Sequence, residues 1–334
     1  MKQVMVTVNG GPEVLRVVES AIPEPQAGQV RLKVLATGIA WADTMARRGQ
    51  YPNEPKKPYA LGYDVVGEVD KLGSNVTSVQ PGQRVAAILI GFGGCAEYIC
   101  VPEDLLVSVP DALSSAEAVA AILNGLTAYH ALHDVAKIKA GESILITSAA
   151  GGVGTMAVQL AKLAGLKVYG ATSSDKLALV RSLGATAIDY RNEDVVETLH
   201  RFNGGGVDVV LDMVGNGQQA LSALKDQGRV MVVGGLSYKN SSLFALGVAI
   251  GMGVLRNLFM RNKKFLYLSD LPTKAHKNKS WYRNTLANLF ELQVEGKLKA
   301  VVAKTYPLEQ AAEGHRLLES GQAAGKIVLL PNAG

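Results

Sequence analysis

Cysteine and histidine are scarce in this sequence. Among 334 residues there are two cysteines, Cys95 and Cys100, and five histidines. Two cysteines cannot build a disulfide framework, and they cannot fill a structural zinc site, which takes a full set of Cys or His ligands. The histidines show no metal-ligand spacing. These absences exclude a disulfide-stapled scaffold and favour a reducing, cytoplasmic compartment.

Long hydrophobic runs are absent as well. The longest apolar stretch, Leu243 to Leu255, has 13 residues and contains three glycines, whereas a membrane span needs roughly 20 apolar residues. The first twenty residues alternate polar and apolar positions and lack the unbroken apolar core of a secretory signal. We therefore expect a soluble protein that is not exported.

The composition is otherwise that of a globular protein. Hydrophobic residues make up 48% of the chain and charged residues 19%, which excludes a disordered or fibrous protein. At roughly 100–200 residues per domain, the length predicts two domains. The formal net charge is +5, and its meaning depends on where the charge lies.

The pattern of apolar residues changes along the chain. Up to about residue 120, short apolar runs are broken by turn residues, which favours a β-rich, barrel-like domain. Strands and helices then alternate, with strands expected over 143–147 and 167–171. This alternation predicts an α/β fold with a parallel, doubly wound sheet. A helix is expected over 308–320 and a closing strand over 326–330.

One of the two domains is expected to be discontinuous. Because the closing strand follows the α/β block, we infer that the tail packs back on the N-terminal β-rich domain. The predicted boundaries are residues 1–123 and 274–334 for the β-rich domain, and 124–273 for the dinucleotide-binding domain.

A glycine-rich loop follows the first strand of the α/β block. The strand Ser143–Thr147 leads through Ser148–Gly154 into a helix over 155–164, and Gly151 and Gly154 match GxGxxG, although Ala149 replaces the first glycine. Such a loop lets the backbone approach a pyrophosphate at a helix N-terminus. The alternative is a tight turn without a ligand. The predicted cofactor contacts are Ala150, Gly151, Gly152, Val153 and Gly154.

The end of the next strand predicts which dinucleotide is bound. NAD sites usually place an acidic residue there to bond the ribose hydroxyls. This chain has Thr172, Ser173 and Lys176, which suit a 2′-phosphate and favour NADPH, although Asp175 argues against it. The alternative is that the hydroxyl residues only cap the following helix.

An ordered set of motifs resembles one family. The motifs are Gly62–Gly67, Pro81–Val85, Asn124–Tyr129, the glycine loop, Gly184-Ala185 with Ile188–Tyr190, and Ala324–Val328. Together they resemble the zinc-free quinone oxidoreductase (ζ-crystallin-like) branch of the medium-chain dehydrogenase/reductase superfamily. The resemblance implies a Rossmann sheet plus a discontinuous GroES-like β-barrel domain.

The resemblance also implies which metal ligands are missing. Zinc-dependent members carry a cysteine where this chain has Ala40, and a His-Glu pair where it has Tyr63 and Asp64. We expect no metal. Hydride transfer to an acceptor that spreads negative charge over conjugated oxygens needs no Lewis acid. The implied activity is therefore NADPH-dependent reduction of quinones, or of the C=C bond of α,β-unsaturated aldehydes and ketones.

Three tyrosines are candidates for a hydrogen-bond donor to the developing oxyanion. Tyr51 and Tyr59 match tyrosines that line the active-site cleft of the family, and Tyr63 lies at the position of a lost metal ligand. A neutral phenol can donate. The alternative is that these rings only wall an apolar pocket. Ala40 also replaces an asparagine common in the branch, which leaves the substrate preference open.

Further cofactor contacts follow from the family positions. Asp43 and Thr127 match residues near the nicotinamide, with helix capping as the alternative, and Tyr190 matches a residue near the adenine or its phosphate. Lys326 could replace an arginine missing near Gly321, or could be structural. The remaining expected contacts, at the end of a strand near the nicotinamide, are Gly234, Gly235 and Leu236.

The positive charge of the chain is concentrated in residues 256–283. This segment has eight lysines and arginines against one acid, Asp270, so the rest is mildly acidic. The resemblance implies a homodimer through an edge strand near 265–270, and we interpret the segment as a solvated rim around that interface and a pocket mouth. The alternative is attraction of an anionic substrate, membrane surface or RNA, which includes the case of a weakly catalytic NADPH-binding protein.

Overall fold

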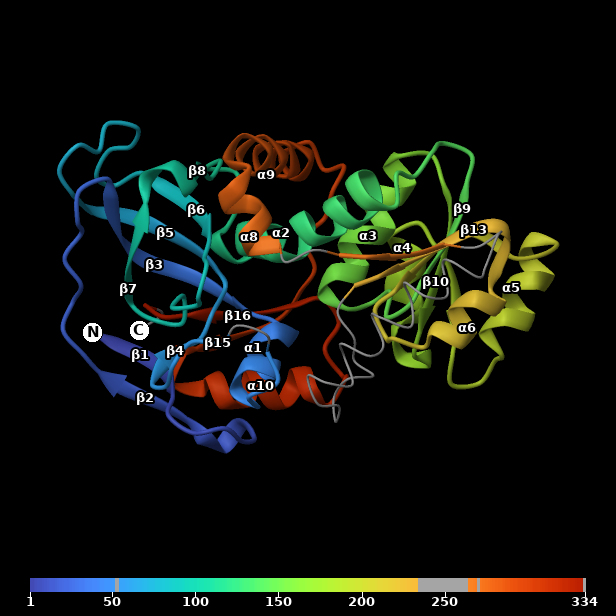
Figure 1. The fold of residues 1–334 in the computed structure, drawn as a ribbon, viewed down its shortest axis with the longest axis horizontal. Coiled ribbons are helices and arrows are strands. Elements are labelled where there is room, and N and C mark those ends of the chain that lie inside the picture. Colours follow the sequence, from blue (N-terminus) through green and yellow to red (C-terminus); the bar gives the residue numbers. More distant parts are fainter. Residues whose placement is uncertain (52–53, 234–263, 269–270, 333–334) are drawn as a thin grey trace. The chain divides into compact units, whose positions relative to one another are not determined.

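The chain divides into two compact units. The computed structural model describes residues 1–51, 54–233, 264–268 and 271–332. One unit comprises Met1–Leu126 with Asp270–Gly334, and the other comprises Thr127–Ser269 (Figure 1). Within the described residues, no helix combines the length and the apolar character that crossing a membrane requires.

The first unit is built on two sheets. A seven-stranded sheet has the order β15-β16-β3-β5-β6-β8, with β7 also paired to β3, and a three-stranded sheet has the order β2-β1-β4. The strands are β1 (Lys2–Val6), β2 (Leu15–Glu19), β3 (Gln29–Ile39), β4 (Tyr59–Ala60), β5 (Asp64–Leu72), β6 (Arg84–Ile88), β7 (Tyr98–Pro102), β8 (Val107–Ser108), β15 (Val302–Pro307) and β16 (Lys326–Leu330).

Alternating apolar residues explain the central strand β3. Val30, Leu32, Val34 and Ala36 are all fully buried, at the period of two that a strand imposes. The closing strand β16 pairs antiparallel with β3, with Val328 opposite Gly38. The tail of the chain thus completes the sheet that the first residues begin.

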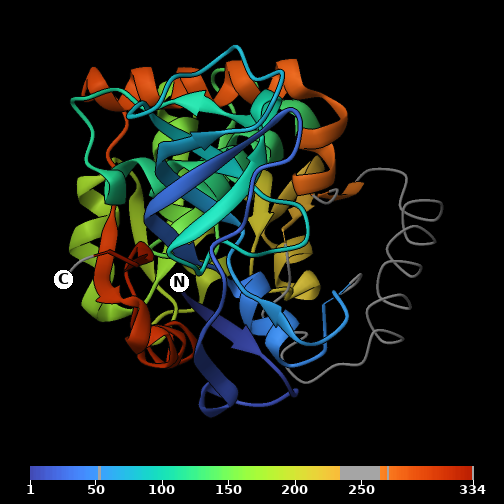
Figure 2. The ribbon, with the colours of Figure 1, turned by 90° about the vertical axis from the view of Figure 1, so that its left-hand side faces the viewer.

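Helices pack on these strands. They are α1 (Trp41–Arg47), most of α2 (Ser115–Tyr129), α8 (Leu271–Lys277), α9 (Lys279–Val294) and α10 (Ala311–Glu319), with short 3₁₀ turns η1 (Pro12–Val14), η2 (Glu103–Leu105) and η6 (Leu308–Gln310). In both views, α9 lies above the strands of the seven-stranded sheet and α10 below them (Figures 1 and 2). Tyr282 anchors α9, because its hydroxyl donates to Leu105 O at 3.1 Å and accepts from Ile88 N at 3.2 Å.

The second unit is a parallel sheet of six strands in the order β11-β10-β9-β12-β13-β14. The strands are β9 (Ser143–Ile146), β10 (Lys167–Thr172), β11 (Thr186–Asp189), β12 (Val207–Asp212), β13 (Leu224–Val232) and β14 (Lys264–Tyr267). In chain order this is 3-2-1-4-5-6, the doubly wound Rossmann arrangement. The predicted α/β fold class is confirmed.

The helices of the second unit connect these strands. They are α3 (Gly152–Leu163), α4 (Leu177–Ser182), α5 (Val195–Asn203) and α6 (Gly217–Ser222), preceded by a π-helical segment η3 (His130–Val135) and with a 3₁₀ turn η4 (Ser174–Lys176). Helix α3 begins at Gly152 and not at Thr155 as expected, because the last glycines of the loop already form its first turn.

Candidate functional site

The glycine loop lies at the carboxyl end of β9. The chain turns at Ser148, whose φ of +51° is in the left-handed region, and Gly151 N donates to Ser148 O at 2.9 Å. Ala149 N donates to Ala171 O at 3.0 Å, which ties the loop to the neighbouring strand β10. These bonds fix the backbone directly before helix α3.

The N-terminus of α3 is open to an anion. Gly151 is the N-cap residue in an extended conformation, and no side chain caps the helix. The first N–H groups of a helix lack intrahelical acceptors, and the helix dipole adds positive potential there. Ala150 and Gly154 are buried, whereas Gly151, Gly152 and Val153 are partly exposed. The exposed part of the loop suits a pyrophosphate.

Packing requires a glycine at position 154. A Cβ atom there would lie 2.3 Å from Ser148 O and 2.8 Å from the carbonyl carbon of Ala149. A Cβ atom at Gly151 would meet nothing closer than Ser148 Oγ at 3.1 Å. Gly154 therefore permits the close approach of α3 to the strand end, which is one of the roles that glycine plays in dinucleotide loops.

The carboxyl ends of β10 and β11 form a second polar region, which we call the β10–β11 corner (residues 172–176 and 189–192). Thr172 and Asp189 are paired in the sheet register, and Tyr190 N donates to Thr172 O at 3.1 Å. Thr172 and Ser173 are buried. Residues 172–176 and 189–192 are therefore linked by backbone contacts between the two strand ends.

Asp189 is engaged inside the corner. Its Oδ1 accepts from Arg191 N at 3.0 Å, and its Oδ2 accepts from Ser174 Oγ at 2.6 Å and from Asn192 Nδ2 at 2.8 Å. The bonds from Ser174 and Asn192 lower the pKa of this carboxyl. Asp189 ends the third strand of this unit along the chain, whereas NAD sites place the acid that binds the ribose hydroxyls at the end of the second strand, so this carboxylate does not occupy that position.

Cations and an aromatic ring complete the corner. Lys176 is 9% exposed. Its pKa is lowered, mainly by burial; the charge of Asp175 opposes this shift and the charge of Arg191 adds to it. A hydrogen bond from Ser173 lowers the pKa of Asp175. Tyr190 is exposed. Sequence reasoning missed Arg191, although it directly follows Tyr190 in the chain. The loop and the corner together fit a dinucleotide.

An aromatic cluster lies in the first unit. Tyr51, Tyr59, Tyr63 and Phe92 form it, with ring centroids of Tyr63 and Phe92 4.2 Å apart and those of Tyr51 and Tyr63 5.8 Å apart. Phe92 also lies 5.6 Å from both Tyr51 and Tyr59. The structure thus brings the three predicted tyrosines together around a phenylalanine that the sequence analysis did not single out.

Phe92 has an unusual backbone. Its φ of +72° is left-handed, between Gly91 and Gly93, which also have positive φ. Such a conformation is strained for a bulky side chain and is retained where surrounding contacts determine it. The ring is buried, at 6% exposed. A phenylalanine within a glycine-rich turn was the sequence signal that could have found it.

The tyrosine hydroxyls differ in their surroundings. Tyr59 OH donates to Glu54 Oε1 at 3.0 Å, and Lys57 pairs with the same carboxylate. Burial, and then the charge of Glu54, raise the pKa of Tyr59, which keeps the phenol protonated. Tyr63 is buried and Tyr51 is partly exposed. Of the three, Tyr51 is the most accessible to a ligand.

Two predicted cofactor residues lie in a buried polar group of the first unit. Lys326 is 2% exposed, and its Nζ donates to Asp64 Oδ2 at 2.9 Å. Asp43 accepts from Ala40 N at 2.7 Å and from Gly62 N at 2.9 Å, and burial raises its pKa to about 7. Asp43 holds the backbone of this unit and Lys326 pairs with a buried carboxylate, and we do not include them in the proposed cofactor site.

The remaining predicted residues are placed as follows. Thr127 is buried on α2, while Gly234, Gly235 and Leu236 lie outside the described residues. The basic segment is described only in part, from Lys264 to Leu268 and from residue 271 on.

Metal donors do not gather in the described part of the chain. No three His, Cys, Asp or Glu side chains there form a group that could hold a metal ion. Cys95 is buried, and burial raises the pKa of its thiol well above the ordinary value, which disfavours a thiolate ligand. The side chains that the structure describes do not fit a zinc site.

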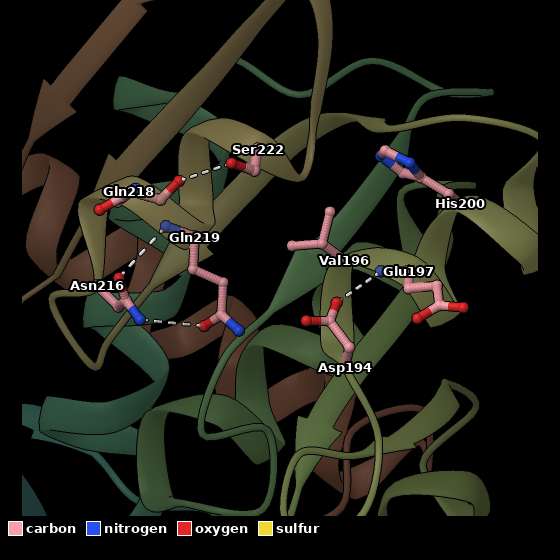
Figure 3. A pocket seen from close by; sticks show the side chains of 8 residues that line it. All are labelled: Asp194, Val196, Glu197, His200, Asn216, Gln218, Gln219 and Ser222. Carbon is pink, nitrogen blue, oxygen red and sulfur yellow. Dashed lines mark hydrogen bonds between the residues drawn. The ribbon is translucent and has the colours of Figure 1, made fainter.

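A shallow pocket of about 710 Å³ lies between α5 and α6. Figure 3 shows its side chains, which are Asp194, Val196, Glu197, His200, Asn216, Gln218, Gln219 and Ser222. Asp194 accepts from Glu197 N and Asn216 accepts from Gln219 N, so both cap their own helices. This pocket has no aromatic wall and does not suit a planar acceptor.

Two family models match the chain. The model described as alcohol dehydrogenase GroES-like domain matches residues 26–111, and the model described as zinc-binding dehydrogenase matches residues 183–329. They fall on the β-rich part and on most of the parallel sheet with the tail.

Curated proteins match over nearly the whole chain. Quinone oxidoreductase 1 of Escherichia coli (strain K12) is 34% identical over 331 residues, 97% of each chain. The 2-haloacrylate reductase of Burkholderia sp is 34% identical over 337 residues, also 97% of each. Synaptic vesicle membrane protein VAT-1 homolog-like of Mus musculus is 31% identical over 339 residues, 98% of this chain and 81% of that protein.

A solved structure has the same fold. The crystal structure of Escherichia coli quinone oxidoreductase complexed with NADPH aligns with a TM-score of 0.87 at 31% identity, covering 99% of this chain and 100% of that chain. The similarity therefore includes both units.

Proposed function

Because the chain belongs to the quinone oxidoreductase-like group of the medium-chain dehydrogenase/reductase family, we propose that it is an NADPH-dependent, zinc-independent reductase of quinones. That it is a nicotinamide-dependent oxidoreductase of this family follows from the comparisons. The quinone acceptor and the choice of NADPH are our proposal.

The aromatic cluster is the observation that carries the acceptor class. Tyr51 is the partly exposed ring of the cluster, and the buried rings of Tyr63 and Phe92 pack against it with centroids 5.8 and 5.6 Å away. A planar conjugated acceptor would stack on Tyr51. A small aliphatic alcohol would gain little from such a surface. The name of the Escherichia coli relative supports the same acceptor class.

The β10–β11 corner supports NADPH. The 2′-phosphate of the cofactor carries about −1.5 to −2 charges near neutral pH, and Lys176 supplies positive charge for it. Thr172 and Ser173 would pack beside it, and Tyr190 would cover the adenine. The second unit therefore serves as the cofactor domain in this proposal, and the first unit as the acceptor domain.

The chemistry divides between the cofactor and the chain. When bound, the nicotinamide supplies a hydride from its C4 atom. Gly151–Val153 bind the pyrophosphate through backbone N–H groups. The aromatic cluster orients the acceptor and excludes water, and Tyr51 Oη donates a hydrogen bond to the oxygen on which negative charge develops. No metal is needed, because conjugation spreads that charge.

An acceptor screen tests the proposal. NADPH oxidation, followed by absorbance, would be measured with 1,2- and 1,4-quinones and with NADH as the control. We expect turnover with quinones and a clear preference for NADPH. Preference for NADH by a large factor would contradict the assignment of the corner, and stoichiometric zinc in the purified protein would contradict the metal-free assignment.

A second candidate is reduction of the C=C bond of α,β-unsaturated carbonyl compounds. The 2-haloacrylate reductase of Burkholderia sp is as similar to this chain as the quinone oxidoreductase, at 34% identity. Hydride addition to the β-carbon of an enone also places charge on a conjugated oxygen. Stereospecific saturation of enones with higher kcat/KM than any quinone would favour this candidate.

We also propose a homodimer that pairs through β14. Lys264–Tyr267 form the edge strand of the six-stranded sheet, bonded on one side to β13. Exposed strand edges are templates for pairing with another chain. Light scattering at micromolar concentration should give twice the chain mass, and a monomer would contradict the proposal.

A further inference from the structure

The turn over residues 189–193 presents two side chains from a fixed backbone. Asp189 O accepts from Asn192 N at 3.2 Å, and Asp189 Oδ1 accepts from Arg191 N. The side chains of Tyr190 and Arg191 are exposed on this turn. The hydrogen bonds of the turn therefore fix the backbone from which both side chains extend.

Arg191 is the cation of this turn. In the described part of the chain, its guanidinium makes no hydrogen bond or ion pair. Burial lowers the pKa of Lys176, and the positive charge of Arg191 lowers it further. Lys176 follows the end of β10 and Arg191 follows the end of β11; the two cations repel each other, and the charge of Asp175 attracts both. A phosphate between them would add further attraction.

The carboxylates of the corner are held by other donors. Asp189 accepts from a backbone N–H, a serine hydroxyl and an asparagine amide. Asp175 accepts from Ser173. The donor groups of Arg191 are therefore the ones left open to a ligand in this part of the corner.

We propose that Arg191 donates to the 2′-phosphate of the cofactor together with Lys176, and that this pair of cations sets the preference for a phosphorylated dinucleotide. The inference rests on the proposed function. A planar guanidinium offers parallel N–H donors that match a phosphate, whereas a lysine ammonium acts as a point charge. A ribose hydroxyl carries no charge and gains little from either group.

Binding of two adenosine nucleotides tests the inference without turnover. 2′,5′-ADP carries the 2′-phosphate and 5′-ADP lacks it. Calorimetry would give Kd values for wild type, Arg191→Gln and, as the charge control, Arg181→Gln, an exposed arginine of α4. We expect the Kd for 2′,5′-ADP to rise about tenfold in Arg191→Gln, which corresponds to a loss of about 1.4 kcal/mol in binding free energy. Affinity for 5′-ADP should stay within about twofold, and Arg181→Gln should change neither.

The outcomes separate the inference from the proposed function. Unchanged 2′,5′-ADP affinity in Arg191→Gln, with wild-type preference for 2′,5′-ADP intact, would overturn the inference alone. Equal affinity of wild type for both nucleotides would overturn the NADPH assignment as well. If both cations contact one phosphate, the losses in Lys176→Gln and Arg191→Gln are non-additive in the double variant. Fully additive losses would contradict a shared contact.

Discussion

Asp43 and His315 are buried groups whose pKa values move in opposite directions. Burial raises the pKa of Asp43 to about 7 and lowers that of His315 to about 3. Between its ordinary value of 3.8 and 7, Asp43 is protonated in the native protein only, so its contribution to stability is lost as the pH rises. Between 3 and 6.5, His315 is protonated in the unfolded chain only, so its contribution is lost as the pH falls.

Single substitutions should reveal these opposing slopes. For His315→Gln, we expect the free energy of unfolding of wild type minus that of the variant to fall by about 1.4 kcal/mol per pH unit as the pH is lowered from about 6 to 4. For Asp43→Asn, the same difference should fall as the pH is raised. Urea denaturation across this range measures both. Parallel pH profiles for wild type and His315→Gln would rule out a neutral buried imidazole.

Gly154→Ala should destabilise the protein, because it disturbs the packing of α3 against the glycine loop. The new Cβ would lie 2.3 Å from Ser148 O, which belongs to the backbone and cannot rotate away. We expect a loss of about 1–3 kcal/mol in the free energy of unfolding. Gly151→Ala is the matched control, because its φ is −74° and its Cβ meets nothing within 3 Å. Equal losses in the two variants would mean that close packing at residue 154 is not the cause.

Phe92→Leu should affect the acceptor and not the cofactor. The substitution removes the ring at the centre of the cluster with Tyr51, Tyr59 and Tyr63. Aromatic contacts contribute about 0.5–1.5 kcal/mol beyond buried area, so KM for a planar quinone should rise by up to about tenfold. The Kd for NADPH should not change. Phe202→Leu, on α5, serves as control, and an unchanged KM in Phe92→Leu would remove this cluster from the acceptor site.

At the scale of elements, helices α1 and α10 are joined by a buried ion pair. Arg47, on α1, is fully buried; its Nη1 donates to Gly10 O at 2.6 Å and its Nη2 pairs with Glu319 at the end of α10. Burial lowers the pKa of this guanidinium, which indicates how costly its charge is without a partner. The pair therefore holds α10 on the first unit.

Glu319→Gln should be strongly destabilising, since it leaves the charge of Arg47 uncompensated. Breaking a buried pair by removing one partner costs about 3–5 kcal/mol. Glu313→Gln is the control on the same helix, because its pair with Arg316 is about half exposed on both sides and should contribute less than about 1 kcal/mol. Thermal and urea unfolding of both variants measure the difference. Similarly small losses of unfolding free energy in the two variants would show that the buried charge of Arg47 does not need Glu319 as its partner.

Local elements could be predicted from the sequence, and long-range pairs could not. The strand, glycine turn and helix around residues 143–163 are specified by neighbouring residues, and the structure has them. Lys326 and Asp64 form a hydrogen bond although they are 262 positions apart in the sequence, and no local sequence pattern predicts such a pair. The prediction that Lys326 could bind the cofactor therefore rested on family position alone. Phe92 was missed because its role depends on tyrosines about 30–40 positions away and on a left-handed backbone.

At the scale of the whole molecule, the order of elements determined most of what could be foreseen. Alternating strands and helices required a parallel sheet with helical connections, and the tail had to find a partner, which is β3. The chemistry of each unit is less predictable, because it depends on which side chains already satisfy one another. Asp175 argues against NADPH in the sequence, and its hydrogen bond from Ser173 could not be foreseen from the order of elements.

In the proposed function, this chain transfers hydride from NADPH to a planar conjugated acceptor without a metal. Stopped-flow oxidation of NADPH deuterated at the transferred C4 position, with a 1,4-quinone and a chelator present, tests it most directly. We expect one hydroquinone formed per NADPH, a primary isotope effect on the hydride step, and no loss of rate with the chelator. Absence of NADPH oxidation, or a rate abolished by the chelator and restored by zinc, would contradict it.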